Sequence, residues 1–204
     1  NWVNKTLTSK EYGVWGDPVV IFDLNGSAYF FHLSRPVNGE WIDRIVCQKS
    51  TDGGISWDDP GTFTGLNPPR KQDKHWVCAD VTGSKWKNNI YVTWTQFDSY
   101  NSGKPEDSSN IMFSLSTDAG ANWTVAVRIN EIAGDCRDSS NSTEGAVPCI
   151  GPDGEIYAGW SNQNKLFFDK STDGGITWLE RDIIAGDQYG GWAYDIPDIY
   201  RCNG

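Results

Sequence analysis

Ser50-Thr51-Asp52-Gly53-Gly54-Ile55-Ser56-Trp57 is an eight-residue phrase that occurs three times in this chain of 204 residues. The other copies are Ser116-Thr117-Asp118-Ala119-Gly120-Ala121-Asn122-Trp123 and Ser171-Thr172-Asp173-Gly174-Gly175-Ile176-Thr177-Trp178. The aspartates of successive copies are 66 and 55 residues apart. A repeat of this period predicts an array of similar supersecondary units rather than one irregular domain.

Each copy has the chemistry of a tight turn. The aspartate accepts hydrogen bonds from backbone N–H groups two or three residues further on, and the glycine supplies a positive φ. The closing tryptophan buries a large ring beneath the turn. Each copy follows a strand-like run, namely Arg44–Lys49, Asn110–Leu115 or Lys165–Lys170. The phrase therefore predicts a hairpin turn with a structural role for nine residues: Asp52, Gly54, Trp57, Asp118, Gly120, Trp123, Asp173, Gly175 and Trp178.

This phrase resembles the Asp-box, or bacterial neuraminidase repeat, of sialidases and sialidase-like β-propellers. The consensus of that motif is Ser/Thr-x-Asp-x-Gly-x-Thr/Ser-Trp, and the second copy departs from it only at Asn122. The resemblance implies an all-β propeller from a secreted or cell-surface protein. It does not by itself imply activity, because the family contains glycosidases, other enzymes and binding proteins.

A second repeat lies upstream of each phrase. Asp17–Tyr29 parallels Gly145–Tyr157, and both read as a strand, an Asn-Gly or Asp-Gly turn and a second strand. Trp76–Asp80 and Asn89–Trp94 repeat the pattern with a longer turn. Each unit is therefore expected to be a four-stranded antiparallel propeller blade, with the Asp-box between its third and fourth strands.

The repeats divide the chain into a partial β-propeller of about three and a half blades. The expected segments are a ring-closing outer strand at 1–13, blades at 14–68, 69–133 and 134–186, and the start of a fourth blade at 187–204. Propellers typically have four to eight blades. The remaining blades are expected from a longer form of the same chain or from homo-oligomerisation.

The composition narrows the class of partner. The formal net charge of −10 argues against nucleic acid and against an anionic membrane surface. There is no apolar run near 18 residues, so no membrane insertion is expected. The five cysteines lack metal-ligand spacing, and one or two disulfides are expected in an oxidising exterior.

Candidate site residues lie just before the first strand of each unit, where they would surround the mouth of the central channel. They are Asp17, Asp73, His75, Glu144 and Asp195. Converging carboxylates can bind glycan hydroxyls, act as acid and base, or hold Ca²⁺. They can equally cap local turns. No cofactor is required by this reading, and calcium is left open.

Aromatic residues near the strand ends favour a carbohydrate ligand, since flat rings stack on sugar faces. The candidates for ligand binding are Trp76, Trp160 and Tyr194, and Trp15 and Trp192 lie in similar places. The alternative role for each ring is to pack one blade against the next.

The resemblance to sialidases can be followed residue by residue. Those enzymes share an Arg-Ile-Pro motif, three arginines that grip a carboxylate, an Asp acid/base, and a Tyr nucleophile paired with a Glu. Thr143-Glu144-Gly145 resembles the segment that carries that Glu. Ser34-Arg35-Pro36 follows a strand instead of forming Arg-Ile-Pro, and Gly159-Trp160-Ser161 replaces the arginine expected after Glu144.

Three functions remain open. The leading expectation is recognition of extracellular carbohydrate at the channel mouth. The second is glycoside hydrolysis through paired carboxylates, with Glu144 and Asp73 as the catalytic candidates. The third is a structural or assembly scaffold at the cell surface.

Overall fold

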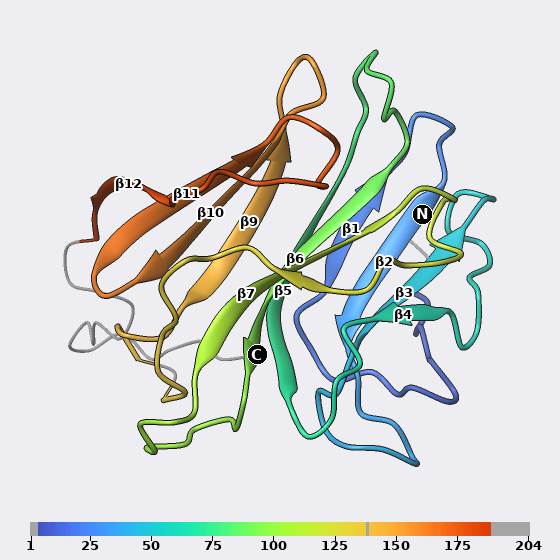
Figure 1. Cartoon of the computed structure of the whole chain (residues 1–204). Coiled ribbons are helices and arrows are strands. Elements are labelled where there is room, and N and C mark those ends of the chain that lie inside the picture. Colours follow the sequence, from blue (N-terminus) through green and yellow to red (C-terminus); the bar gives the residue numbers. More distant parts are fainter. Residues whose placement is uncertain (1–3, 138, 189–204) are drawn as a thin grey trace.

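The computed structural model describes residues 4–137 and 139–188, and their regular structure is entirely β (Figure 1). The first sheet contains β1 (Val19–Phe22), β2 (Ala28–Leu33), β3 (Ile45–Ser50) and β4 (Thr62–Thr64). The second contains β5 (Lys71–Ala79), β6 (Ile90–Phe97), β7 (Ser109–Ser116) and β8 (Val127–Arg128). The third contains β9 (Glu144–Ile150), β10 (Ile156–Asn162), β11 (Lys165–Ser171) and β12 (Ile183–Asp187).

Each sheet is a simple antiparallel meander. Every strand pairs with the next strand along the chain, from the inner strand (β1, β5 or β9) to the outer strand (β4, β8 or β12). The inner strand of each sheet packs against the inner strand of the next, β1 against β5 and β5 against β9. These are three consecutive blades of a β-propeller, and we call them blades 1, 2 and 3. The predicted fold class and the place of the repeated turns are confirmed.

The ends of the chain were expected to contribute to ring closure. Residues 4–13 contain no strand. They lie against the outer part of blade 1, where Gln48 Nε2 donates to Thr8 O at 2.8 Å and Ser9 Oγ donates to Pro60 O at 2.9 Å. The ring-closing strand stays a prediction, since its partner blade is not among the described residues. The expected start of a fourth blade, beyond residue 188, also lies outside them.

The three repeated phrases form turns closed by their aspartates, and we call them the repeat turns (50–57, 116–123 and 171–178). In the third, Asp173 accepts hydrogen bonds from the Thr177 backbone at 2.9 Å and from the Thr177 hydroxyl at 2.6 Å. Ser171 Oγ donates to Asp173 and accepts from the Gly175 N–H, both within 2.9 Å. These donors favour the ionised carboxylate and, led by the Thr177 hydroxyl, lower the pKa of Asp173 to about 2.

The second and third repeat turns (116–123 and 171–178) each pack against the preceding blade. Trp123 packs edge-on against Phe31 of blade 1, with ring centroids 5.8 Å apart, and Trp178 packs against Phe113 of blade 2 at 5.0 Å. Gly175 has a φ of +91°, and a Cβ there would lie 2.5 Å from the Phe113 ring. The glycine is therefore required both by the backbone conformation and by the close approach of the preceding blade.

The hydrophobic core lies between the blades in two clusters. The cluster between blades 1 and 2 includes Tyr29, Phe31, Leu33, Val77 and Trp94. The cluster between blades 2 and 3 includes Tyr91, Phe113, Ile129, Ile156 and Trp160. Burial of such large side chains is the main favourable contribution to stability, and it depends on adjacent blades remaining docked.

The expected disulfides are not found among the described residues. Cys47, Cys78, Cys136 and Cys149 are all free thiols, and Cys202 lies outside the described part. Cys47 is buried in the core, where burial raises the pKa of its thiol. It behaves as a small hydrophobic side chain.

We predict that Gly175→Ala lowers the free energy of unfolding more than Gly54→Ala does. Both glycines have a φ near +90°, so both variants incur left-handed strain of about 1–2 kcal/mol. Only the Cβ at residue 175 also collides with Phe113, whereas the nearest atom to a Cβ at residue 54 is 3.8 Å away on Trp57. Equal losses in chemical denaturation would show that repeat turn 3 does not press against blade 2.

Asp169 is a buried acid in the core of blade 3. Its Oδ1 accepts from the backbone N–H groups of Lys170 at 2.6 Å and Leu179 at 3.0 Å. Its Oδ2 is buried and accepts no hydrogen bond from the part of the chain described. Burial, together with the nearby charge of Asp182, raises the pKa of Asp169 to about 6.

We predict that Asp169→Asn stabilises the protein at pH 7 but much less at pH 4. An acid whose folded pKa exceeds its unfolded pKa keeps its proton in the folded state. Folding stability therefore falls as the pH rises between about 4 and 6. The stability difference between Asp169→Asn and wild type should grow by about 2 kcal/mol over that range. The measurement is urea unfolding of both proteins from pH 4 to pH 7. A stability difference that stays constant over this range would contradict the raised pKa.

Candidate functional site

The inner strands share one irregularity at the end where they begin. Asp17, Lys74 and Gly145 each have a positive φ, of 53°, 52° and 71° respectively. In blades 2 and 3 the pairing register of the inner strand also shifts at this place. These features describe a β-bulge repeated in every blade. The bulge aligns the three blades independently of the sequence repeats.

The bulge decides which acidic residues are equivalent. Asp73 and Glu144 immediately precede the bulge residue in blades 2 and 3, and Gly16 is their counterpart in blade 1. Asp17 is itself the bulge residue, so it is shifted by one position. Of the carboxylates expected to converge on the mouth, Asp73 and Glu144 therefore occupy equivalent positions and form a pair. Asp195 lies outside the described residues.

Two buried hydroxyl groups connect the strands that carry Asp73 and Glu144. Thr95 lies opposite Asp73 in the β5–β6 register, and its Oγ1 donates to the carbonyl of Thr143 at 3.2 Å. Thr93 Oγ1 donates to the carbonyl of Ala146 at 2.8 Å. These bonds tie β6 of blade 2 to β9 of blade 3 on either side of Glu144. They fix the position of Glu144 relative to blade 2.

Both carboxylates are withdrawn from solvent. Asp73 is 7% exposed and Glu144 is 1% exposed. The backbone N–H of Lys74 donates to Asp73 Oδ1 at 2.9 Å, an interaction that the bulge makes possible. Carboxylates in such settings can accept hydroxyl hydrogen bonds or exchange protons. The pair is thus the polar part of the candidate site.

His75 does not contact this site. Its ring is buried against blade 1, near His32 and the Phe31 backbone. The bulge at Lys74 shifts the alternation of β5, so His75 and Asp73 face opposite ways although they are two residues apart. Burial, together with the nearby His32, lowers the pKa of His75 to about 3, so the ring is neutral at physiological pH. His75 therefore lies in the interface between blades 1 and 2, and its role in ligand binding stays a prediction.

The three predicted aromatic contacts have different outcomes. Trp160 is buried in the core and stacks on Phe167, with centroids 6.3 Å apart and planes within 10°, so neither face is open to a sugar. In this structure the ring has the alternative role of packing one blade against the next. Trp76 is about half exposed on β5 and remains accessible. Tyr194 lies outside the described residues.

An aromatic rim lies beside the carboxylate pair, and we define it as Trp15, Trp41 and Tyr100. The Trp15 and Trp41 rings meet edge to face at 6.0 Å, and the Trp41 and Tyr100 rings meet at 5.3 Å. Trp15 is 47% exposed and Trp41 is 37% exposed. The guanidinium of Arg35 lies 4.5 Å from the centre of the Trp15 ring, a cation–π contact.

The rim shares the end of the blades where the carboxylate pair lies. Inner strands begin and second strands end there, so the loop that carries Trp41 after β2 and the loop that carries Tyr100 after β6 both belong to it. The backbone links them too, since the Gln72 N–H, next to Asp73, donates to the carbonyl of Ile42 at 2.7 Å. Sequence reasoning missed Trp41 and Tyr100 because it considered aromatic residues close to strand ends, and these two lie further along the loops that follow the second strands. We call this end of the blades the mouth.

Metal binding gains no support at the mouth. Within residues 4–137 and 139–188, no group of three or more His, Cys, Asp or Glu side chains could hold a metal ion. Calcium therefore stays a prediction that depends on residues outside those ranges.

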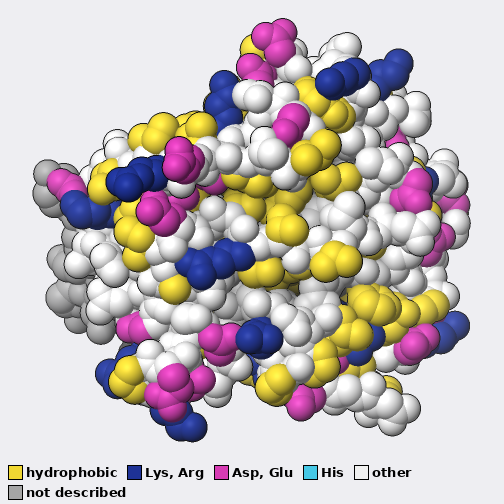
Figure 2. Space-filling model, viewed as in Figure 1, with side chains coloured by type: hydrophobic (Ala, Val, Ile, Leu, Met, Phe, Trp, Pro, Cys, Tyr) yellow, Lys and Arg dark blue, Asp and Glu magenta, His cyan; other side chains and the backbone are white. Residues whose placement is uncertain are grey.

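On the face shown in Figure 2, Lys and Arg side chains lie scattered among Asp and Glu rather than gathered in one patch. The described residues contain no helix able to span a membrane.

No protein-family model matches this sequence, and a search of curated proteins finds no match. The structure is nevertheless similar to solved glycosidases. The Hadza microbial sialidase Hz136 is 17% identical, with a TM-score of 0.58 over 83% of this chain. The NanB sialidase from Streptococcus pneumoniae is 9% identical, with a TM-score of 0.59 over 88%. The α-L-arabinanase from Penicillium chrysogenum, complexed with arabinobiose, is 14% identical, with a TM-score of 0.59 over 92%.

These similarities establish a sialidase-like propeller fold. The chain spans 37%, 44% and 53% of the three solved chains respectively. The blades described above therefore correspond to about a third to a half of each of those proteins. At such low identity the likeness concerns the fold and does not transfer an activity.

We predict that Thr93→Val lowers the free energy of unfolding by about 1–2 kcal/mol, because the carbonyl of Ala146 loses its buried donor. Thr93→Ser keeps the hydroxyl and should recover most of that loss. Denaturant unfolding of the two variants provides the measurement. Equal stability of the Val and Ser variants would show that the hydroxyl does not fasten blade 3 to blade 2.

Proposed function

We propose that the mouth binds extracellular glycan, in a secreted or cell-surface sialidase-like protein of which this chain forms part. The repeat turns are interpreted as Asp-boxes, in line with their sequence and their hydrogen bonds. The observation that carries the proposal is the aromatic rim lying at the same end of the blades as the Asp73 and Glu144 pair.

The chemistry of the rim suits a sugar. Trp15 and Trp41 present flat, partly exposed indole rings, and a pyranose ring offers C–H groups that pack on such a surface. Arg35 adds a charged donor beside Trp15, able to bond a sugar hydroxyl or carboxylate. The carboxylates of Asp73 and Glu144 supply acceptors for hydroxyl groups. A few polar groups within an apolar surface are typical of small-molecule sites.

A second candidate function is glycoside hydrolysis at the same site. It is favoured by the equivalent positions of Asp73 and Glu144 on adjacent inner strands, since glycosidases commonly work through two carboxyl groups. Their burial suits an acid or base shielded from bulk water. The third function, a surface scaffold, requires no ligand at the mouth.

The test uses glycan binding and turnover with 3′-sialyllactose and arabinobiose as probes. We expect Trp41→Ala to weaken binding by about tenfold, since it removes a stacking surface. Ile55→Ala is the control, because Ile55 is an exposed apolar residue of a repeat turn, away from the mouth. Equal affinities for both variants, or no binding together with ordered self-assembly, would overturn the proposal.

Glu144→Gln separates recognition from hydrolysis. If the protein is a hydrolase, turnover is lost while binding persists, because the amide keeps the shape but cannot transfer a proton. If wild type binds without turnover, the recognition function stands alone and the catalytic role of Glu144 is rejected. Circular dichroism checks that each variant is folded.

A further inference from the structure

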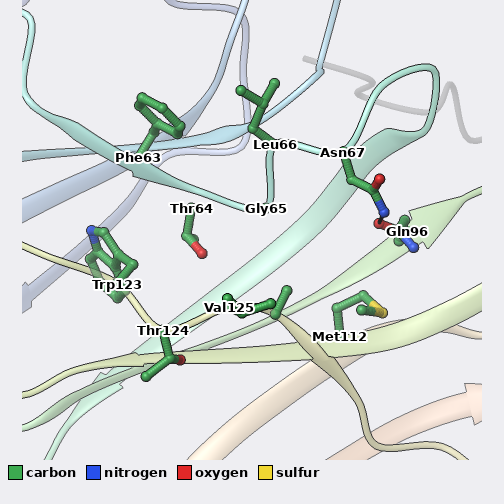
Figure 3. A pocket seen from close by; sticks show the side chains of 11 residues that line it. Phe63, Thr64, Gly65, Leu66, Asn67, Gln96, Met112, Trp123, Thr124 and Val125 are labelled. Carbon is green, nitrogen blue, oxygen red and sulfur yellow. Dashed lines mark hydrogen bonds between the residues drawn. The ribbon is translucent and has the colours of Figure 1, made fainter.

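A groove of about 520 Å³ opens between blades 1 and 2, on the side of their third and outer strands (Figure 3). It contains none of the carboxylate pair or the aromatic rim, although Asn67, in the loop before β5, and Gln96, near the end of β6, lie at the mouth end of the blades. Trp123 and Phe63 stand on one side, Asn67 and Gln96 on the other, and Met112 lies at the base near Val125. Both walls belong to adjacent blades of this chain.

The groove exists because the interface between blades 1 and 2 has smaller side chains than the interface between blades 2 and 3 at matching positions. Trp94 faces Met112 across β6 and β7, and Trp160 faces Phe167 across β10 and β11. Phe167 is therefore the counterpart of Met112. In the interface between blades 2 and 3, Phe167 stacks on its tryptophan and fills the space. In the interface between blades 1 and 2, the slimmer Met112 leaves it open.

A second matching position adds to the difference. Thr64 pairs with Ile45 at the edge of β3, and the Ile129 N–H bonds to the carbonyl of Ile111 at the edge of β7. Ile129 is thus the counterpart of Thr64 one blade later, and it belongs to the core cluster there. The substitution of a small polar side chain for a large apolar one opens the groove and places a hydroxyl in it.

The polar groups of the groove are neutral amides and hydroxyls. Asn67 Nδ2 donates to Gln96 Oε1 at 3.1 Å, which fixes the two side chains face to face (Figure 3). This bond leaves the Asn67 carbonyl and the Gln96 amino group able to bond a ligand. Thr64 Oγ1 donates to Ser114 Oγ at 2.9 Å, so its lone pairs remain acceptors. The groove therefore offers both donors and acceptors at fixed positions.

No Asp, Glu, Lys, Arg or His side chain lines the groove. The whole chain contains 27 acidic and 17 basic residues, so the uncharged lining of the groove contrasts with the rest of the chain. A groove lined only by neutral side chains disfavours charged ligands. Apolar surface comes from Trp123, Leu66 and Val125. Apolar walls with a few fixed neutral polar groups match a ligand that has C–H faces and hydroxyl edges.

We propose that this groove is a second carbohydrate site, which binds a neutral saccharide independently of the mouth. The Trp123 side of the groove packs the C–H face of the sugar, and the amide pair bonds its hydroxyls. A sugar acid is disfavoured, because its carboxylate would lie among neutral side chains with no cation to pair it.

The test converts the open interface into a copy of the filled one. The double variant Thr64→Ile, Met112→Phe introduces the side chains found at the matching positions of the next interface. The probes are cellotriose, maltotriose and xylotriose at millimolar concentration, with 3′-sialyllactose as the anionic comparison, measured by titration calorimetry. We expect at least one neutral trisaccharide to bind wild type and to lose about tenfold or more affinity in the folded double variant.

A single substitution provides a test that does not depend on repacking the core. Gln96→Glu removes the amino group and adds a charge, and it should also weaken neutral saccharide binding. Trp41→Ala, at the mouth, should leave groove binding unchanged, which separates this proposal from the proposed function of the mouth. Unchanged affinity in both groove variants, no binding of any neutral trisaccharide, or 3′-sialyllactose binding that the groove variants weaken as much as neutral saccharide binding would overturn the proposal.

Discussion

The seating of a repeat turn against the preceding blade is the interaction on which the rest of the structure depends. The aspartate closes the turn through hydrogen bonds within the phrase, so the glycine and tryptophan are positioned by local interactions. Trp178 then lies against Phe113 of blade 2, and Trp123 against Phe31 of blade 1. Local turn chemistry and long-range packing are thereby the same feature. A blade that forms its turn correctly also presents the surface that its neighbour needs.

Docked blades in turn determine what the mouth can hold. A residue with positive φ lies at or near the start of each inner strand, and the bulge places Asp73 and Glu144 at equivalent positions. The hydroxyls of Thr93 and Thr95 reach from blade 2 to the backbone of blade 3 and hold those positions across the interface. The Asp73 and Glu144 pair is therefore a product of blade docking. The geometry of the mouth therefore depends on contacts in the core between the blades.

The sequence predicted the fold because the signals for it are local and repeated. The phrase at 50–57 and its two copies each predict a turn, and the spacing between them predicts a repeat architecture. The site was harder to predict because a side chain's direction depends on bulges and on the facing blade. His75 and Trp160 lie beside strand ends in sequence, yet both point into blade interfaces. The equivalence of Asp73 and Glu144 likewise became clear only from the positive-φ residue that follows each of them.

Trp41 and Tyr100 show a different limit. No motif marks them, and their value lies in the fact that loops distant in sequence meet at one end of the blades. A topological rule could have found them, since every second strand of an antiparallel blade ends where the inner strand begins. Applying that rule to the loops after β2 and β6 would have placed both residues at the mouth.

Divergence within a repeat is informative in the same way. Repeated interfaces that serve only stability should converge on similar large apolar side chains, because core packing contributes the same free energy in each. The interface between blades 2 and 3 follows this expectation with Ile129 and Phe167. The interface between blades 1 and 2 gives up that burial at both matching positions and gains a groove with fixed amides. Thr64 and Met112 both line the same groove, and both reduce the packing of the interface. This coincidence argues that the groove has a function other than stability.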